Sequence, residues 1–155
     1  LKALCNAYHV PFVVNDSVEI ALQCGADGVH VGQSDIKGRD IRAIIGLDKI
    51  LGISAGTVEQ AIAAEQAGAD YIGVGAVFPT STKKDAKPME TELLRRISNA
   101  ASIPVVAIGG ISRDNVLELA GCGLDGVAVV SALFAQKDVK AAAEEMLRLS
   151  EEIAK

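Results

Sequence analysis

Hydroxyl and ammonium groups are concentrated in one ten-residue stretch of the sequence, "VFPTSTKKDA" at positions 77–86. Three consecutive hydroxyl residues, Thr80 to Thr82, are followed directly by Lys83 and Lys84. Such donors can bind a phosphate group through charge-assisted hydrogen bonds. The same residue types are also common in solvated turns, so the stretch alone leaves a polar turn and a phosphate site open.

Two further stretches favour the phosphate site. Gly109 and Gly110 in "AIGGIS" offer backbone N–H groups that an oxyanion can approach closely, because neither residue carries a side chain. Ser131 in "VVSALF" stands at the start of a predicted short helix, where free N–H groups and the helix dipole attract an anion. All three stretches follow predicted strands, so we predict one phosphate cradle at a shared edge of the sheet.

Acidic and amide side chains follow two other predicted strands. Asn15 and Asp16 end the stretch "FVVND", and Gln33 and Asp35 lie in "VHVGQSD". Carboxylates on neighbouring strand ends can share one Mg2+ ion, whose remaining ligands would be water and substrate phosphate. Asp is also a common helix N-cap in such loops, so spacing alone leaves a metal site and two helix caps as equal alternatives.

Strands and helices must alternate to bring these residues together. Short β-branched runs are separated by helical patterns, and several helices end in Gly shortly before an acidic residue and a strand, as in "CGADGVHV" and "AGADYIGVG". The predicted strands are Phe12–Val14, Gly28–Val31, Ile50–Ile53, Tyr71–Val74, Val105–Ile108 and Gly126–Val130. The predicted helices are Leu1–Tyr8, Val18–Cys24, Arg39–Ile45, Val58–Ala67, Glu90–Ala100, Arg113–Ala120 and Val139–Ile153.

The two faces of the predicted strands differ in residue size. Alternation places small residues on one face, with His30 as an inward, hydrogen-bonded residue, and bulky residues on the other. The small face holds Gly28, Gly52, Ser54, Gly73, Gly75, Ala107, Gly109, Gly126 and Ala128, and the bulky face includes Leu51, Ile72, Val106 and Ile108. An open sheet would place helices on both faces. In a TIM (β/α)8 barrel the loops after all the strands converge on one mouth. Polar residues follow nearly every predicted strand, which favours the barrel.

Composition limits the class of protein. The chain has 155 residues, a net charge of -5 and half of its residues apolar, which predicts a single α/β domain without a basic face for nucleic acid. The apolar runs are too short to cross a membrane. Three widely spaced cysteines suggest reduced thiols in a cytoplasmic protein. Only six strands are predicted, and the chain opens at Leu1 inside a helix, so we expect the barrel domain 1–155 to lack two N-terminal βα units.

The sequence resembles the thiamine phosphate synthase family over essentially its whole length. The similar stretches are, in order, "FVVND", "GADGVHVGQSD", "GISAGT", "GVGAVFPTSTKKDA", "IPVVAIGGI" and "GVAVVSALF". The resemblance implies a TIM-barrel transferase that joins hydroxymethylpyrimidine diphosphate to hydroxyethylthiazole phosphate, with Mg2+ as cofactor, and releases pyrophosphate. In this family the pyrimidine cation forms as diphosphate departs. The implied partners are these small molecules, and homo-oligomerisation is left open.

The resemblance also assigns roles to individual residues. Asp16 and Asp35 would hold Mg2+, and Asn15, Ser54 and Lys83 would contact the pyrimidine diphosphate, with Ser54 and Lys83 as the catalytic residues. The thiazole phosphate would be bound by Thr80, Thr82, Gly110, Val130 and Ser131.

The chain departs from the family pattern in two places. Gly56 stands where the family usually has His, and a Gln-x-Arg-x-Lys motif that supplies positive charge is absent. The second departure leads us to expect impaired activity. Three alternatives to the synthase remain: an isomerase like the related thiazole tautomerase, a generic phosphate-binding barrel enzyme, and an inactive barrel fragment. The missing motif supports the last of these.

Overall fold

The computed structural model describes residues 1–80 and 88–154 and contains one six-stranded parallel sheet. The strands lie side by side in chain order, and all neighbouring pairs are parallel. They are β1 (Val13–Asn15), β2 (Gly28–Val31), β3 (Ile50–Ala55), β4 (Tyr71–Gly75), β5 (Val105–Ile108) and β6 (Gly126–Ala128). The six predicted strands are thus confirmed, with shifts of one or two residues at their ends.

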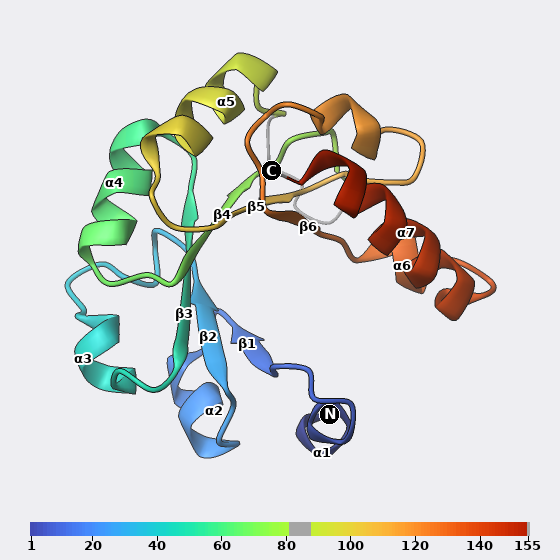
Figure 1. Ribbon diagram of the computed structural model, residues 1–155. Coiled ribbons are helices and arrows are strands. Elements are labelled where there is room, and N and C mark those ends of the chain that lie inside the picture. The colour runs from blue at the N-terminus through green and yellow to red at the C-terminus, as the bar shows by residue number, and fades with distance from the viewer. Residues whose placement is uncertain (81–87, 155) are drawn as a thin grey trace.

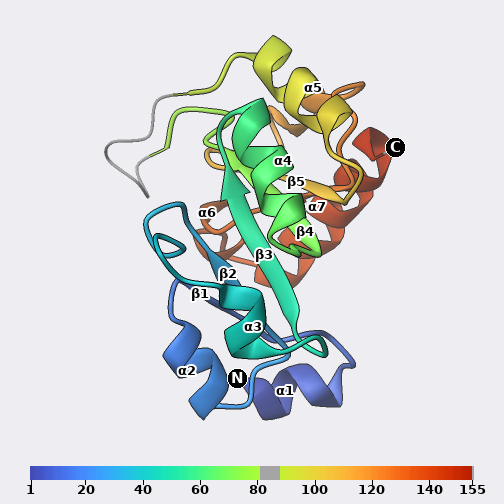
Figure 2. The same ribbon diagram turned by 90° about the vertical axis from the view of Figure 1, so that its left-hand side faces the viewer.

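Helices cover the convex side of this curved sheet (Figure 1). In the view turned by 90°, α3 and α4 lie in front of the strands (Figure 2). Helix α2 packs on β1 and β2, α4 packs on β3 and β4, and α7 packs on β6. The helices are α1 (Lys2–Ala7), α2 (Val18–Gln23), α3 (Ile41–Ile45), α4 (Val58–Gln66), α5 (Thr91–Ala100), the 3-10 helix η1 (Val116–Leu119), α6 (Ser131–Phe134) and α7 (Val139–Ile153).

A Gly-x-Asp motif joins a helix to the following strand at three places. Its glycines, Gly25, Gly68 and Gly123, all have positive φ, as the predicted helix ends require. Each motif aspartate then forms two hydrogen bonds with one residue of the preceding strand region. Its backbone N–H donates to the carbonyl, and its carboxylate accepts the N–H; the pairs are Asp27 with Phe12, Asp70 with Leu51, and Asp125 with Val105. The motif therefore ties together the amino ends of adjacent strands.

The core lies between the bulky strand face and the helices. Val29, Leu51, Ile53 and Ile72 are at most 1% exposed, as the strand alternation predicts. The assignment of faces in β5 was wrong. Gly73 is paired with Val106, so Val106 and Ile108 belong to the concave face, whereas Val105 and Ala107 are buried under the helices. The run "IPVVAIGG" is apolar throughout, so alternation of residue type could not decide its orientation.

Two further predictions differ from the structure. Instead of an α-helix at Arg113–Ala120, the segment forms only the short helix η1, whose hydrogen bonds join mostly residues three apart. The closed eight-stranded barrel is not confirmed, because the sheet of the described residues has six strands, with β1 and β6 at its outer edges. Within residues 1–80 and 88–154, no helix is both long and apolar enough to span a membrane.

Candidate functional site

The carboxyl ends of β1 and β2 carry the predicted acidic residues. Asn15 is the last residue of β1 and is paired with His30, and the N–H of Asp16 donates to the carbonyl of His30 at 2.8 Å. Asp16 is exposed and has a φ of 67°, a left-handed conformation that is uncommon outside glycine. Its side chain does not cap α2, because Ser17 Oγ accepts the N–H of Ile20 there.

Asp35 is held in the loop after β2. Its Oδ2 accepts the N–H of Gly32 at 2.8 Å, and Ser34 Oγ donates to its Oδ1 at 3.4 Å. Asp40, not Asp35, caps α3. The helix-cap alternative is therefore wrong for both acidic residues, and both carboxylates lie at the same edge of the sheet.

A chain of three polar side chains lies on the concave face. His30 Nδ1 is 3.0 Å from Tyr71 Oη, and His30 Nε2 is 3.0 Å from Ser54 Oγ. The inward, hydrogen-bonded position predicted for His30 is confirmed. Two glycines leave the space for this arrangement: a Cβ on Gly52 would collide with the Tyr71 ring, and one on Gly73 would lie 2.8 Å from the His30 ring.

Tyr71 was missed as a candidate site residue. Burial raises the pKa of its hydroxyl above the ordinary value, so the group stays protonated at neutral pH and can bond to His30. The signal was present in the sequence, because Tyr71 alternates with Gly73 and Gly75 on the small face. Its contact with His30 depends on the pairing of Gly52 with Tyr71, which the sequence does not reveal.

The predicted phosphate cradle begins where β4 ends. After Gly75, the chain continues alongside β5: Val77 N–H donates to the Ile108 carbonyl, and Phe78 N–H donates to the Gly109 carbonyl, each at 3.0 Å. A Cβ on Gly110 would collide with the Pro79 carbonyl oxygen. The chain leading to Thr80 therefore packs directly on the double-glycine turn after β5.

The structure describes some of the remaining predicted phosphate ligands and not others. Val130 and Ser131 are exposed and follow β6, with Ser131 as the first residue of α6. This edge of the sheet thus carries Asn15, Asp16, Asp35, Ser54, Gly110 and Ser131 at the carboxyl ends of five parallel strands. Thr82 and Lys83 lie outside the described residues.

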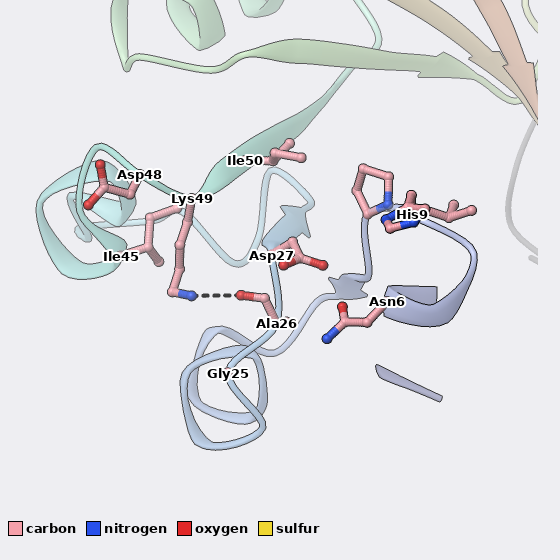
Figure 3. A pocket seen from close by; sticks show the side chains of 11 residues that line it. Asn6, His9, Gly25, Ala26, Asp27, Ile45, Asp48, Lys49 and Ile50 are labelled. Atoms are coloured by element: carbon pink, nitrogen blue, oxygen red, sulfur yellow. Dashed lines mark hydrogen bonds between the residues drawn. The ribbon is translucent and has the colours of Figure 1, made fainter. Parts of the chain in front are cut away.

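A cavity of about 800 Å³ opens at the opposite edge of the sheet (Figure 3). It lies beside the amino ends of β1, β2 and β3, and no predicted site residue lines it. Two of its charged side chains hold nearby loops, since Lys49 Nζ donates to the Ala26 carbonyl and Asp27 accepts the N–H of Phe12. The cavity is therefore separate from the candidate site.

Comparisons with known proteins identify relatives of this chain. A family model described as thiamine monophosphate synthase matches residues 1–133. A thiamine-phosphate synthase of Ruminiclostridium cellulolyticum is 55% identical over 149 residues, which make up 96% of this chain and 71% of the relative. One from Clostridium tetani is 49% identical over 94% of this chain and 70% of the relative. A solved structure, thiamine phosphate pyrophosphorylase from Pyrococcus furiosus, has a TM-score of 0.87 and 42% identity, covering 98% of this chain and 73% of that chain.

The matches cover nearly the whole of this chain and 71% and 70% of the two relatives. They do not confirm the expectation that two N-terminal βα units are missing or that activity is impaired, which stays a prediction. The family model spans well over half of the residues. The relatives are well above 30% identical, and the chain covers more than two thirds of each. The chain belongs to the thiamine-phosphate synthase family.

Proposed function

We propose that this enzyme couples hydroxymethylpyrimidine diphosphate to hydroxyethylthiazole phosphate in a Mg2+-dependent, dissociative reaction. The bond between the pyrimidine methylene carbon and the diphosphate oxygen breaks first, and its electron pair leaves with the diphosphate. The thiazole nitrogen then donates its lone pair to the methylene carbon, which gives thiamine phosphate and free pyrophosphate. The synthase names of the relatives favour this transferase over an isomerase.

The observation that carries the proposal is the shared edge of the sheet. Carboxylates follow β1 and β2, whereas the glycine turn and the serine of the predicted phosphate cradle follow β5 and β6. One edge thus offers ligands for a cation and for an anion, as a reaction between a diphosphate and a phosphate ester requires. In this proposal the curved sheet forms the wall of a (β/α)8 barrel, because sequential parallel order with helices outside is the arrangement of that fold.

The acidic residues fit Mg2+. Their oxygens are hard ligands, and the Gly32 N–H already orients the carboxylate of Asp35. The described residues contain no group of three or more acidic, His or Cys side chains that could enclose a metal. Two carboxylates with water and substrate oxygens suit Mg2+, which is seldom held by protein ligands alone. When bound, Mg2+ would neutralise negative charge on the diphosphate.

The chain's own residues would bind and orient the two substrates. Asn15 and Ser54 would hydrogen-bond the pyrimidine diphosphate, and Lys83 would stabilise the charge that develops on the departing pyrophosphate. The thiazole phosphate would be held at the opposite end of the same edge. Its ligands would be the hydroxyls of Thr80 and Thr82 and the backbone of Gly110, Val130 and Ser131. No side chain needs to act as a nucleophile.

Thiamine phosphate formation by the purified chain tests this function. With Mg2+ and both substrates we expect product, and with EDTA we expect none. Asp16→Asn and Asp35→Asn should each lower kcat/KM by about a hundredfold, because each removes a charged metal ligand. Asp114→Asn, which changes an exposed aspartate of a surface ion pair, is the matched control. Full Mg2+-dependent turnover in both site variants would contradict the metal assignment.

A further inference from the structure

The double-glycine turn after β5 is anchored by its carbonyl groups. Gly109 and Gly110 have φ angles of 99° and 69°. The Gly109 carbonyl accepts the N–H of Phe78 at 3.0 Å, and the Gly110 carbonyl accepts the side-chain amide Nδ2 of Asn115 at 3.0 Å. Both carbonyls of the turn are therefore bonded within the protein.

The anchored carbonyls determine where the N–H groups point. In a planar trans peptide the N–H points opposite to the C=O. The N–H of Gly110 shares a peptide plane with the Gly109 carbonyl, so it points away from Phe78. The N–H of Ile111 shares a plane with the Gly110 carbonyl, so it points away from Asn115. Successive N–H groups of this kind form an anion-binding concavity.

Asn115 is itself held at both ends of its amide. Its Oδ1 accepts the N–H of Ser112 at 2.8 Å while its Nδ2 donates to Gly110. Only this orientation gives both amide atoms a suitable partner, because the oxygen cannot donate and the nitrogen cannot accept. Asn115 is half-buried and precedes Val116, which is fully buried at the start of η1. The burial of Val116 in the core therefore helps to hold Asn115, which in turn holds the double-glycine turn.

We propose that Asn115 is a positioning residue for phosphate: through the Gly110 carbonyl, it fixes the peptide plane whose N–H group, that of Ile111, joins the Gly110 N–H in binding the phosphate of the thiazole substrate. The inference rests on the proposed function, which places that phosphate at Gly110. Asn115 does not touch the ligand. It sets the orientation of the backbone that does.

Two substitutions separate this role from simple turn stabilisation. Asn115→Asp keeps the acceptor for the Ser112 N–H but cannot donate to the Gly110 carbonyl, whereas Asn115→Ala loses both hydrogen bonds. If Asn115 only stabilised the turn through Ser112, an aspartate would replace it fully. Under the proposal, both variants lose phosphate affinity, and only Asn115→Asp recovers the thermal stability of the wild type in part. Asn99→Ala and Asn99→Asp, on the exposed face of α5, are matched controls.

Calorimetric titration with hydroxyethylthiazole phosphate and with its unphosphorylated alcohol tests the inference without requiring turnover. Both Asn115 variants should bind the phosphate ester about tenfold more weakly, since charge-assisted hydrogen bonds are lost, and should bind the alcohol like the wild type. Wild-type affinity of Asn115→Asp for the ester, or equal weakening of ester and alcohol, would overturn the positioning role alone. A wild-type chain that binds no ester would overturn the proposed function, and this inference with it.

Discussion

At the residue scale, His30 shows how small neighbours make a polar site within an apolar sheet. Its ring joins Tyr71 to Ser54 across three strands, and the missing side chains of Gly52 and Gly73 provide the room. Ser54 is thereby tied to one hydrogen-bond partner on the concave face. We infer that His30 limits the orientations of the Ser54 hydroxyl, which the proposed function places against the pyrimidine diphosphate.

Two amide substitutions of His30 test this dependence. The amide of Asn can replace the His Nδ1 position, near Tyr71, whereas the longer Gln can replace the Nε2 position, near Ser54. We expect His30→Asn to lower kcat/KM for the pyrimidine diphosphate by about tenfold, the effect of roughly one lost hydrogen bond. His30→Gln should lower it less. Steady-state kinetics of both variants give the measurement.

The chain supplies its own control for these kinetics. His9 is the other histidine, is exposed, and has a positive φ that Asn tolerates well. His9→Asn should therefore leave kcat/KM unchanged. Equal losses in His30→Asn and His30→Gln would show that Ser54 does not depend on the ring.

Residue types predicted part of this site. Glycines at a strand end indicated Gly110, and alternation placed His30 and Ser54 on the concave face, whereas the role of Ser54 came only from the family resemblance. The contact of Tyr71 with His30 could not be predicted, because it is set by a strand register that depends on the whole sheet. The support of Gly110 by Asn115 was also hidden, since it arises within a segment that was expected to be an α-helix.

At the scale of elements, the Gly-x-Asp motif explains the repetition seen in the sequence. The glycine ends a helix, the middle residue is buried, and the aspartate bonds to the preceding strand region. The repetition made the βα units predictable, because each unit uses the same local solution. The orientation of β5 was not predictable, because an unbroken apolar run has no polar face.

Asp70 provides a test of the motif's contribution to stability. Its carboxylate accepts the N–H of the fully buried Leu51 and also pairs with Arg42. Asp70→Ala should lower the free energy of unfolding by about 1–3 kcal/mol, because the backbone N–H of Leu51 loses its hydrogen-bond acceptor. Asp70→Asn keeps an acceptor and should cost less. Urea unfolding measures both variants, with Asp114→Ala as an exposed control. Equal losses of stability in Asp70→Ala and Asp70→Asn would assign the effect to the lost ion pair with Arg42 instead.

The link between α4 and the chain before β5 should depend on pH. Ser102 donates two hydrogen bonds to Glu65, from its hydroxyl and its backbone N–H, and these lower the pKa of the carboxyl below its ordinary value of 4.5. At acidic pH the unfolded chain binds this proton more readily than the folded chain does. The contribution is therefore present above the ordinary pKa and is lost as pH falls through the lower pKa of the folded state.

Urea unfolding of the wild type and of Glu65→Gln across this range measures the effect. We expect the difference in unfolding free energy to be greatest near neutral pH and to shrink on acidification. Glu151→Gln, at an exposed position of α7, is the matched control. A difference that stays constant between neutral and acidic pH would show that the Ser102 bonds do not favour the charged carboxylate.

At the scale of the whole molecule, the curved sheet exposes backbone groups at its outer strands and several large apolar side chains. In the described part of the chain, β1 and β6 each pair with one neighbouring strand, and α1 and α7 lie at opposite ends of the sheet (Figure 1). Unpaired strand edges present N–H and C=O groups that can pair with another chain. Large apolar side chains are exposed near the β5 and β6 end, with Ile108 at 42% and Phe134 at 74%.

We therefore expect the 155-residue chain to associate in solution, with apparent mass rising with concentration in size-exclusion chromatography with light scattering. Ile108 lies on the concave face beside Ala128 of the outer strand β6, so Ile108→Asn should reduce association by removing apolar surface next to the open edge. Leu47 is 88% exposed in the loop between α3 and β3 and belongs to neither outer strand. Leu47→Asn removes a comparable apolar side chain and should leave association unchanged, which separates an effect of the edge from a general effect of surface hydrophobicity. A wild-type chain that stays monomeric at every concentration would show that the open edges do not bind a second copy. Equal effects of Ile108→Asn and Leu47→Asn on association would place the contact elsewhere on the surface.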